Sequence, residues 1–344
     1  MNVYRYLKVA ASSLLPAPLK ILGLWGLYVG RRRMAGVFLD PVLACNLRCK
    51  MCYMSNDAQR VPMRGQTLTP ADARRIADAL YSRALKLQIG CATEPTLYPR
   101  LAELIADARS RGVPYISLTS NGKLLASERV SLMALADAGL DELTLSLHGT
   151  TREVYEELMP GARYDELLRL PALVADVKER HPGFKLRVNF TVNSLNVDDL
   201  AGERFWDLWK GGARPDIVQL RPVQDMGDTA WTDFDLTPLK ERYAETIGAV
   251  AARCRELGIQ CLAPTLGQLD EVATDQDGTS SLISEMTYCY VSPNETYRPD
   301  FLDDDTYDSY HRRRGTARRL LRAVFRGNSP SKRQGTKHLN YHVK

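Results

Sequence analysis

The chain has 344 residues, of which 44% are hydrophobic, and a formal net charge of +5. This apolar share is enough for a sizeable core, in one barrel-sized domain or two smaller ones. Seven cysteines are too few for a disulfide-stabilised scaffold of this length, and no cleavable signal sequence is evident. We therefore expect a protein of the reducing cytoplasm.

Predicted strands and helices alternate along most of the chain. Thr69 followed by Pro70 is a typical helix start. Six strand–helix units in series predict an α/β fold, a partial (β/α)6 TIM-like barrel with a parallel sheet. The predicted strands are 36–43, 85–90, 114–122, 141–149, 184–193 and 216–223. The predicted helices are 69–84, 97–112, 127–139, 197–212 and 237–258, with a further helical region over 151–180 that is interrupted near MPGARY.

Positive charge is concentrated at the two ends of the chain. Residues 1–33 carry six lysines or arginines and residues 311–344 carry eleven, with no acidic residue in either segment. Such basic ends predict an anionic partner. The apolar run 21–30 is too short for a membrane span, which needs about 20 residues. We expect it either to lie in a membrane interface or to pack on the flank of the barrel.

These features divide the chain into four segments. In chain order they are an amphipathic N-terminal segment, the partial barrel, a polar C-terminal extension that we expect over the barrel mouth, and a basic helix with a tail. Their predicted ranges are 1–33, 34–262, 263–310 and 311–344.

Three cysteines fall within eight positions in the stretch CNLRCKMC, directly after the first predicted strand. They are Cys45, Cys49 and Cys52. In open α/β sheets, ligands bind beyond the carboxyl ends of the strands. A structural zinc ion and a [4Fe–4S] cluster both normally take four protein ligands, so three cysteines leave one position open for a small molecule. A closed zinc site stays an alternative, with Cys91 as a candidate fourth ligand.

The stretch CNLRCKMC matches the CxxxCxxC motif of the radical S-adenosylmethionine (SAM) enzymes. Four later stretches resemble that family's strand-end motifs in the same order. They are GCATEPTLYP (90–99, like GGEP), TSNG (119–122), SLHG (146–149, like SLDG) and VNFTVN (188–193). The chain is thus similar to radical SAM enzymes over residues 36–225.

This resemblance implies a [4Fe–4S] cluster on the three cysteines and SAM on its open iron. It also implies reductive cleavage of SAM to a 5′-deoxyadenosyl radical that abstracts hydrogen from a substrate, with a flavodoxin- or ferredoxin-like electron donor. Glu94 would accept a hydrogen bond from the SAM ammonium group, and Met51 would lie near the adenine. Candidates for ribose or carboxylate contacts, each of which has a loop-capping role as its alternative, are Ser120, Asn121, Ser146 and Asn189.

Two further residues are candidates for acting on the substrate. His148 replaces the aspartate of the SLDG pattern and either acts as an acid or base or hydrogen-bonds the following turn. Residues 288–300 resemble a SPASM extension that lacks its cysteines, so we expect no auxiliary cluster there. Cys289 within them either returns a hydrogen atom to a substrate radical, as in an epimerase, or is a buried packing residue.

The basic ends suggest the substrate and location. We expect a membrane-adjacent or anionic glycan or lipid intermediate, with a peptide as the runner-up, and a cytoplasmic protein peripheral to an anionic membrane. Two other interpretations remain: a non-catalytic protein with structural zinc, and RNA modification with the basic tail on phosphates.

Overall fold

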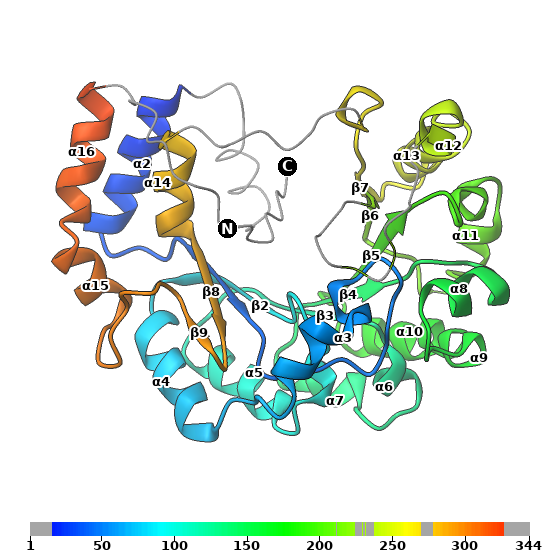
Figure 1. The fold of residues 1–344 in the computed structure, drawn as a ribbon, viewed down its shortest axis with the longest axis horizontal. Coiled ribbons are helices and arrows are strands. Elements are labelled where there is room, and N and C mark those ends of the chain that lie inside the picture. The colour runs from blue at the N-terminus through cyan, green and yellow to red at the C-terminus, as the bar shows by residue number, and fades with distance from the viewer. Residues whose placement is uncertain are drawn as a thin grey trace.

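The computed structural model describes residues 16–210, 212–223, 229, 231, 237–269 and 278–326. The predicted basic ends therefore lie partly outside the described residues, as does part of the predicted extension. The described strands form one nine-stranded sheet in the order β7-β6-β5-β4-β3-β2-β1-β8-β9. Figure 1 shows this sheet as the inner layer of an open arc, with most helices on its outer side.

All neighbouring strands run parallel except the short β9, which pairs antiparallel with β8. The six predicted strands are present, and the predicted α/β partial barrel is confirmed. The strands are β1 (Ala35–Leu39), β2 (Ala84–Ile89), β3 (Ile116–Ser120), β4 (Glu142–Ser146), β5 (Lys185–Val192), β6 (Ile217–Pro222), β7 (Gln260–Leu262), β8 (Tyr288–Ser292) and β9 (Glu295–Thr296).

Helices connect the strands. Thr69 caps α4 as predicted, since its hydroxyl accepts a hydrogen bond from the backbone of Asp72, whose side chain bonds back to the Thr69 backbone. The connecting helices are α3 (Asp57–Arg60), α4 (Pro70–Leu80), α5 (Leu101–Ser110), α6 (Lys123–Ala126), α7 (Leu132–Asp137), α8 (Arg152–Leu158), α9 (Tyr164–Leu167), α10 (Leu170–Arg180), α11 (Arg204–Asp207), α12 (Thr237–Glu241) and α13 (Ile247–Glu256).

Several predicted elements differ from the structure. The single long helix predicted over 237–258 is two helices, α12 and α13. The long helix predicted over 197–212 is wrong: a 3₁₀ turn and α11 replace it, and Gly202 between them has φ +71°. The first strand ends at Leu39, before Asp40 and Pro41, because proline lacks a backbone donor. The basic helix is two helices, α15 (Tyr307–Arg313) and α16 (Thr316–Arg326), separated by Gly315 at φ +61°.

The C-terminal segment completes the sheet. We expected residues 263–310 over the barrel mouth, but β8 instead pairs with β1 at the edge of the sheet. Helices α2 (Ala17–Val29), α14 (Gly278–Thr287), α15 and α16 pack next to it (Figure 1). The buried side chains that these N- and C-terminal segments share form a second hydrophobic core: Ile21, Leu24, Met34, Leu282, Met286 and Leu320.

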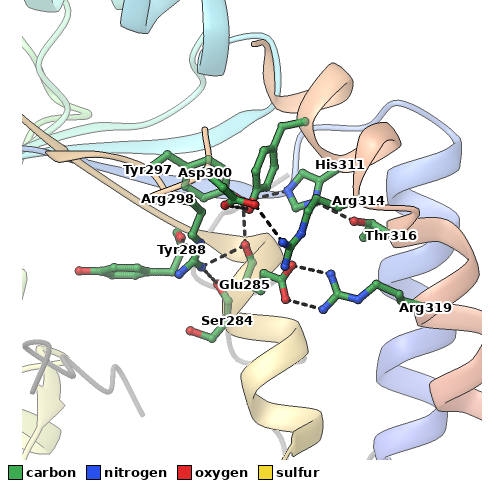
Figure 2. A network of polar contacts seen from close by, with 11 residues as sticks. Ser284, Glu285, Tyr288, Tyr297, Arg298, Asp300, His311, Arg314, Thr316 and Arg319 are labelled. Atoms are coloured by element: carbon green, nitrogen blue, oxygen red, sulfur yellow. Dashed lines mark hydrogen bonds and ion pairs between the residues drawn. The ribbon is translucent and has the colours of Figure 1, made fainter. Parts of the chain in front are cut away.

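A polar network connects these helices to β8 and β9. Figure 2 shows His311 between Tyr297 and Thr316, at 2.8 Å from the Tyr297 hydroxyl and 3.0 Å from the Thr316 hydroxyl. Arg319 donates two 2.7 Å hydrogen bonds to the Glu285 carboxylate. The C-terminal helices are therefore fixed to the barrel. None of the described helices is long and apolar enough to cross a membrane.

Candidate active site

The three clustered cysteines lie in the loop after β1, at the carboxyl edge of the sheet. The Cys45 thiol accepts the Leu47 backbone N–H at 3.4 Å, and the Cys52 thiol accepts the Met54 N–H at 3.5 Å. Burial raises the pKa of Cys45 to about 12, and burial together with Cys52 and Cys45 raises the pKa of Cys49 well above its ordinary value. The loop therefore brings the three thiols into one neighbourhood.

Glu94 lies beside the thiols, as the resemblance implied. Burial is the main cause that raises the pKa of both Cys45 and Cys49, and the negative charge of the Glu94 carboxylate is a smaller cause of the same shift. Its own pKa is raised by burial, although several hydrogen bonds oppose that shift. One carboxylate oxygen accepts bonds from Thr96 and Ser120, and the other, Oε2, accepts the Asn121 N–H at 2.8 Å. Oε2 therefore retains acceptor capacity for a ligand.

Ser120 and Asn121 hold this carboxylate and the cysteine loop together. Ser120 is buried, and its hydroxyl donates to Glu94 at 2.8 Å. The Asn121 amide nitrogen donates to Asn46 at 2.8 Å and lies 3.9 Å from the Cys45 sulfur. Both side chains thus connect the end of β3 to the site.

Sequence reasoning missed Asp40, which shapes the loop that carries Glu94. Its buried carboxylate accepts the backbone N–H groups of Cys91 and Ala92, and the Thr93 hydroxyl at 3.2 Å. The hydroxyl of Tyr290 on β8 donates to the same carboxylate at 2.9 Å. An aspartate at the end of an apolar strand sequence is a sign of a buried hydrogen-bond acceptor. The sequence around Tyr290, in contrast, gives no sign that its hydroxyl contacts Asp40.

Ser146, the last residue of β4, lies opposite Asn189 in the middle of β5. Strand alternation puts Ser146 on the same face as Glu142, and Asn189 on the same face as Arg187, and these two charged residues contact each other inside the barrel. The side-chain amide oxygen of Asn189, Oδ1, is buried and has no hydrogen-bond partner among the described residues. This pair therefore offers unused polar capacity near the site.

His148 and Met51 are both buried. The His148 ring nitrogen Nδ1 accepts the Thr191 backbone N–H at 3.1 Å, and burial lowers its pKa to about 4. The imidazole is therefore neutral at pH 7 and connects the end of β4 to β5. This bond is to the neighbouring strand and not to the turn after His148, which was the second of its two predicted roles. Met51 packs in the main core beside the cysteine loop.

The structure does not bring Cys289 to the site. Its neighbours on β8 point into the barrel, since Tyr288 stacks on Phe38 at 4.4 Å and Tyr290 reaches Asp40. Cys289 therefore faces the other side of the sheet, where it is fully buried near Tyr297. Burial raises its pKa to about 12.

Two other features lie apart from the cysteine loop. Cys91, the candidate fourth zinc ligand, has Asp40 and Lys86 as its electrostatic neighbours, and its thiol lies 4.0 Å from the Gln88 carbonyl oxygen. A cavity of about 540 Å³ next to Lys178 and Asp216 lies at the amino ends of β6 and β7. That is the opposite edge of the sheet from the cysteines.

Comparison with known proteins identifies the barrel. Residues 40–194 match the family model of the Radical SAM superfamily. A "Probable GTP 3',8-cyclase" of Metallosphaera sedula is 34% identical over 160 residues, covering 45% of this chain and 46% of that protein. One of Saccharolobus islandicus is 27% identical over 207 residues, covering 59% and 62%. The chain therefore spans only about half to three-fifths of these curated relatives.

Solved structures share the fold. Streptococcus suis SuiB bound to S-adenosylmethionine superposes with a TM-score of 0.53 at 17% identity, covering 81% of this chain and 68% of that chain. SuiB bound to its precursor peptide SuiA gives 0.54 at 15% identity, covering 81% and 65%. At such identities the likeness describes the fold alone.

The residues present fit the cofactors that this superfamily uses, a [4Fe–4S] cluster and SAM. No three histidine, cysteine or acidic side chains within the described ranges converge as they would around one metal ion. In a [4Fe–4S] cluster each cysteine thiolate binds a different iron, so three thiols that do not converge on one point fit such a cluster. The amide nitrogen of Asn46, which follows Cys45 in the chain, is buried and has no hydrogen-bond partner among the described residues, as expected next to a ligand. Residues 40–194, which include the three-cysteine loop, therefore match the Radical SAM superfamily.

Proposed function

We propose that this chain is a radical SAM enzyme whose loop cysteines Cys45, Cys49 and Cys52 bind a [4Fe–4S] cluster. The observation that carries the proposal is the grouping of three thiols with the Glu94 carboxylate at the carboxyl edge of a partial barrel. When bound, the cluster and SAM supply a reductive C–S cleavage and a 5′-deoxyadenosyl radical that abstracts hydrogen from the substrate. An external flavodoxin- or ferredoxin-like protein provides the electron.

In this proposal the chain's own residues bind and orient SAM. Glu94 Oε2, which accepts one hydrogen bond from the protein, accepts another from the SAM ammonium group. The unpartnered Asn189 oxygen, with Ser146 beside it, accepts from ribose hydroxyls. Asp40 fixes the loop that presents Glu94. The catalytic contribution of the protein is therefore positioning.

The substrate that we propose is a membrane-adjacent or anionic glycan or lipid intermediate. Its support is the arginine-rich helix α16, which packs beside the largely apolar helix α2 at one end of the barrel. A purine nucleotide is a second candidate, because two relatives carry the name GTP 3',8-cyclase over the aligned barrel region. A peptide is the third, the runner-up expected from the sequence.

Anaerobic reconstitution tests the cofactor. We expect about four irons per wild-type chain, and 5′-deoxyadenosine when the reduced protein is incubated with SAM. Replacing Cys49 by alanine should abolish both. Replacing Cys91, a half-buried cysteine outside the loop, should leave the iron content unchanged. Zinc without iron, or loss of iron in the Cys91 variant, would refute the proposal.

A second assay addresses the substrate. The rate of 5′-deoxyadenosine formation is measured with an organic-solvent extract of membrane lipids, with GTP, and with neither. Stimulation by the lipid extract supports the proposed class. Stimulation by GTP alone would assign the nucleotide instead.

A further inference from the structure

Helix α2 exposes an apolar face to solvent. Ile21 and Leu24 point into the second hydrophobic core. On the other side, the side chains of Leu19, Leu22 and Val29 are 54%, 43% and 53% exposed. These three residues recur at about one helical face, and Lys20 is the helix's single charged residue. A surface helix of a soluble domain normally places charges there.

Helix α16 extends this face from the other end of the chain. It lies beside α2 and runs in the opposite direction, so its last turn lies next to the first turn of α2 (Figure 1). Leu320 packs against Ile21 in the shared core. Phe325 in the last turn is 83% exposed, and Arg318 and Arg322 are exposed on the same side of the helix.

The arginines around this face are not neutralised. Neither α2 nor α16 contains an acidic residue. Arg31, Arg32, Arg318 and Arg322 are exposed, and none of them forms an ion pair with another described residue. Arg319, in contrast, points inward and binds Glu285 (Figure 2). The outward charge of the two helices is therefore purely positive.

We propose that α2 and α16 together form a docking surface for an anionic phospholipid bilayer. Leu19, Leu22 and Phe325 enter the boundary between headgroups and acyl chains, and the four unpaired arginines bind lipid phosphates. The barrel rests on the membrane surface through these two packed helices, and none of the described helices crosses the bilayer.

Charge complementarity selects this occupant over others. A second copy of the chain in a two-fold interface would bring identical arginines together, with no acidic partner on either helix. A nucleic acid would satisfy the arginines but leave the exposed leucines and phenylalanine in water. An anionic bilayer satisfies both groups.

Flotation of the full-length protein with lipid vesicles tests the proposal. We expect binding to phosphatidylcholine vesicles that contain phosphatidylglycerol, little binding to pure phosphatidylcholine vesicles, and weakening as salt is raised. The triple variant Leu19→Ser, Leu22→Ser, Phe325→Ser should bind about tenfold more weakly or worse. So should the double variant Arg318→Gln, Arg322→Gln.

Matched controls use equally exposed residues elsewhere. Leu168→Ser combined with Leu302→Ser, at 50% and 54% exposure, should bind within about twofold of wild type, as should Arg100→Gln with Arg253→Gln. Equal binding to neutral and anionic vesicles, or undiminished binding of the triple variant, would overturn the proposal. The proposal would also be overturned if the wild-type protein were a dimer that bound no vesicles and the triple variant were a monomer. Formation of 5′-deoxyadenosine without vesicles is measured separately, so failure here is distinct from failure of the proposed radical chemistry.

Discussion

At the scale of single residues, the site depends on a carboxylate that is costly to bury. Glu94 is 2% exposed, and burial raises its pKa. Donors from Thr96 and Ser120 meet one oxygen, and the Asn121 N–H meets the other. Both carboxylate oxygens accept hydrogen bonds from donors among the described residues. The side chain at this position must therefore offer an acceptor at each of its two terminal atoms, as a carboxylate does.

The substitution Glu94→Gln tests this arrangement. The glutamine amide would place its own N–H₂ against a buried donor, so we expect a loss of about 1–3 kcal/mol in the free energy of unfolding. SAM affinity should fall as well. Urea denaturation and SAM titration of the reconstituted protein measure the two effects. Glu103→Gln on the exposed face of α5 is the control, and an equal effect of both variants would contradict the assigned role.

Lys86 gives a pH-dependent prediction. It lies inside the barrel near Glu142 and Arg187, and burial lowers its pKa to about 8. Between about pH 8 and the ordinary lysine pKa near 10.4, the unfolded chain holds a proton that the folded chain has lost. The stability contributed by this residue therefore rises with pH across that window.

Replacing Lys86 by methionine should remove this rise. At pH 7 the variant should be more stable than wild type by about 1–3 kcal/mol, and the difference should shrink towards pH 10. Urea denaturation at pH 7, 8.5 and 9.5 measures it. Lys210→Met, at an exposed lysine paired with Asp207, should show no such trend. A constant difference at all three pH values would exclude a lowered pKa.

At the scale of elements, the turn after β2 needs glycine for two separate reasons. Gly90 has φ +80°, and a Cβ there would lie 2.5 Å from the Thr119 carbonyl oxygen and 2.6 Å from the Pro95 ring. This turn leads directly into the loop of Cys91 to Glu94. Close approach of β3 and a left-handed backbone therefore combine at one residue.

The pair Gly90→Ala and Gly65→Ala separates the two reasons. Gly65 has a similar φ of +77°, but nothing lies within 4 Å of the position that a Cβ would take there. We expect Gly65→Ala to cost about 1 kcal/mol from the backbone alone. Gly90→Ala should cost about 3 kcal/mol or more, because backbone and proline atoms would also have to move. Equal losses in urea denaturation would show that the turn relaxes freely.

The sequence was informative where chemistry and periodicity are local. The spacing of the cysteines, the position of Glu94 and the alternation of strands and helices are all encoded within short segments. Contacts between distant segments were not predictable in this way. The bond from Tyr290 to Asp40 joins residues 250 positions apart, and the direction of Cys289 depends on the pairing of β8 with β1. A one-residue change in that register would have turned its thiol into the barrel.

At the scale of the whole molecule, the first and the last described helices pack together on the same side of the barrel. Arg83, in the turn before β2, connects them. Its side chain is 2% exposed and donates to the carbonyl oxygens of Tyr28 and Arg32 at 2.8 and 3.0 Å. Its Nε lies 3.1 Å from the carboxylate of Asp308 on α15. One buried guanidinium thus binds α2, the barrel and the C-terminal helices.

The substitution Arg83→Met should therefore release both ends together. It leaves two partly buried carbonyl groups and Asp308 without the Arg83 guanidinium. We expect a loss of about 2–4 kcal/mol in the free energy of unfolding, reduced because Asp308 is partly exposed. Arg253→Met, which removes an exposed pair with Glu256, should cost less than about 1 kcal/mol. Hydrogen exchange followed by mass spectrometry should show faster exchange in α2 and α15 of the Arg83 variant, with β3 to β5 unchanged. If exchange rises in α2 alone, Arg83 does not couple the two ends, and the membrane surface proposed for α2 and α16 would not move as one unit.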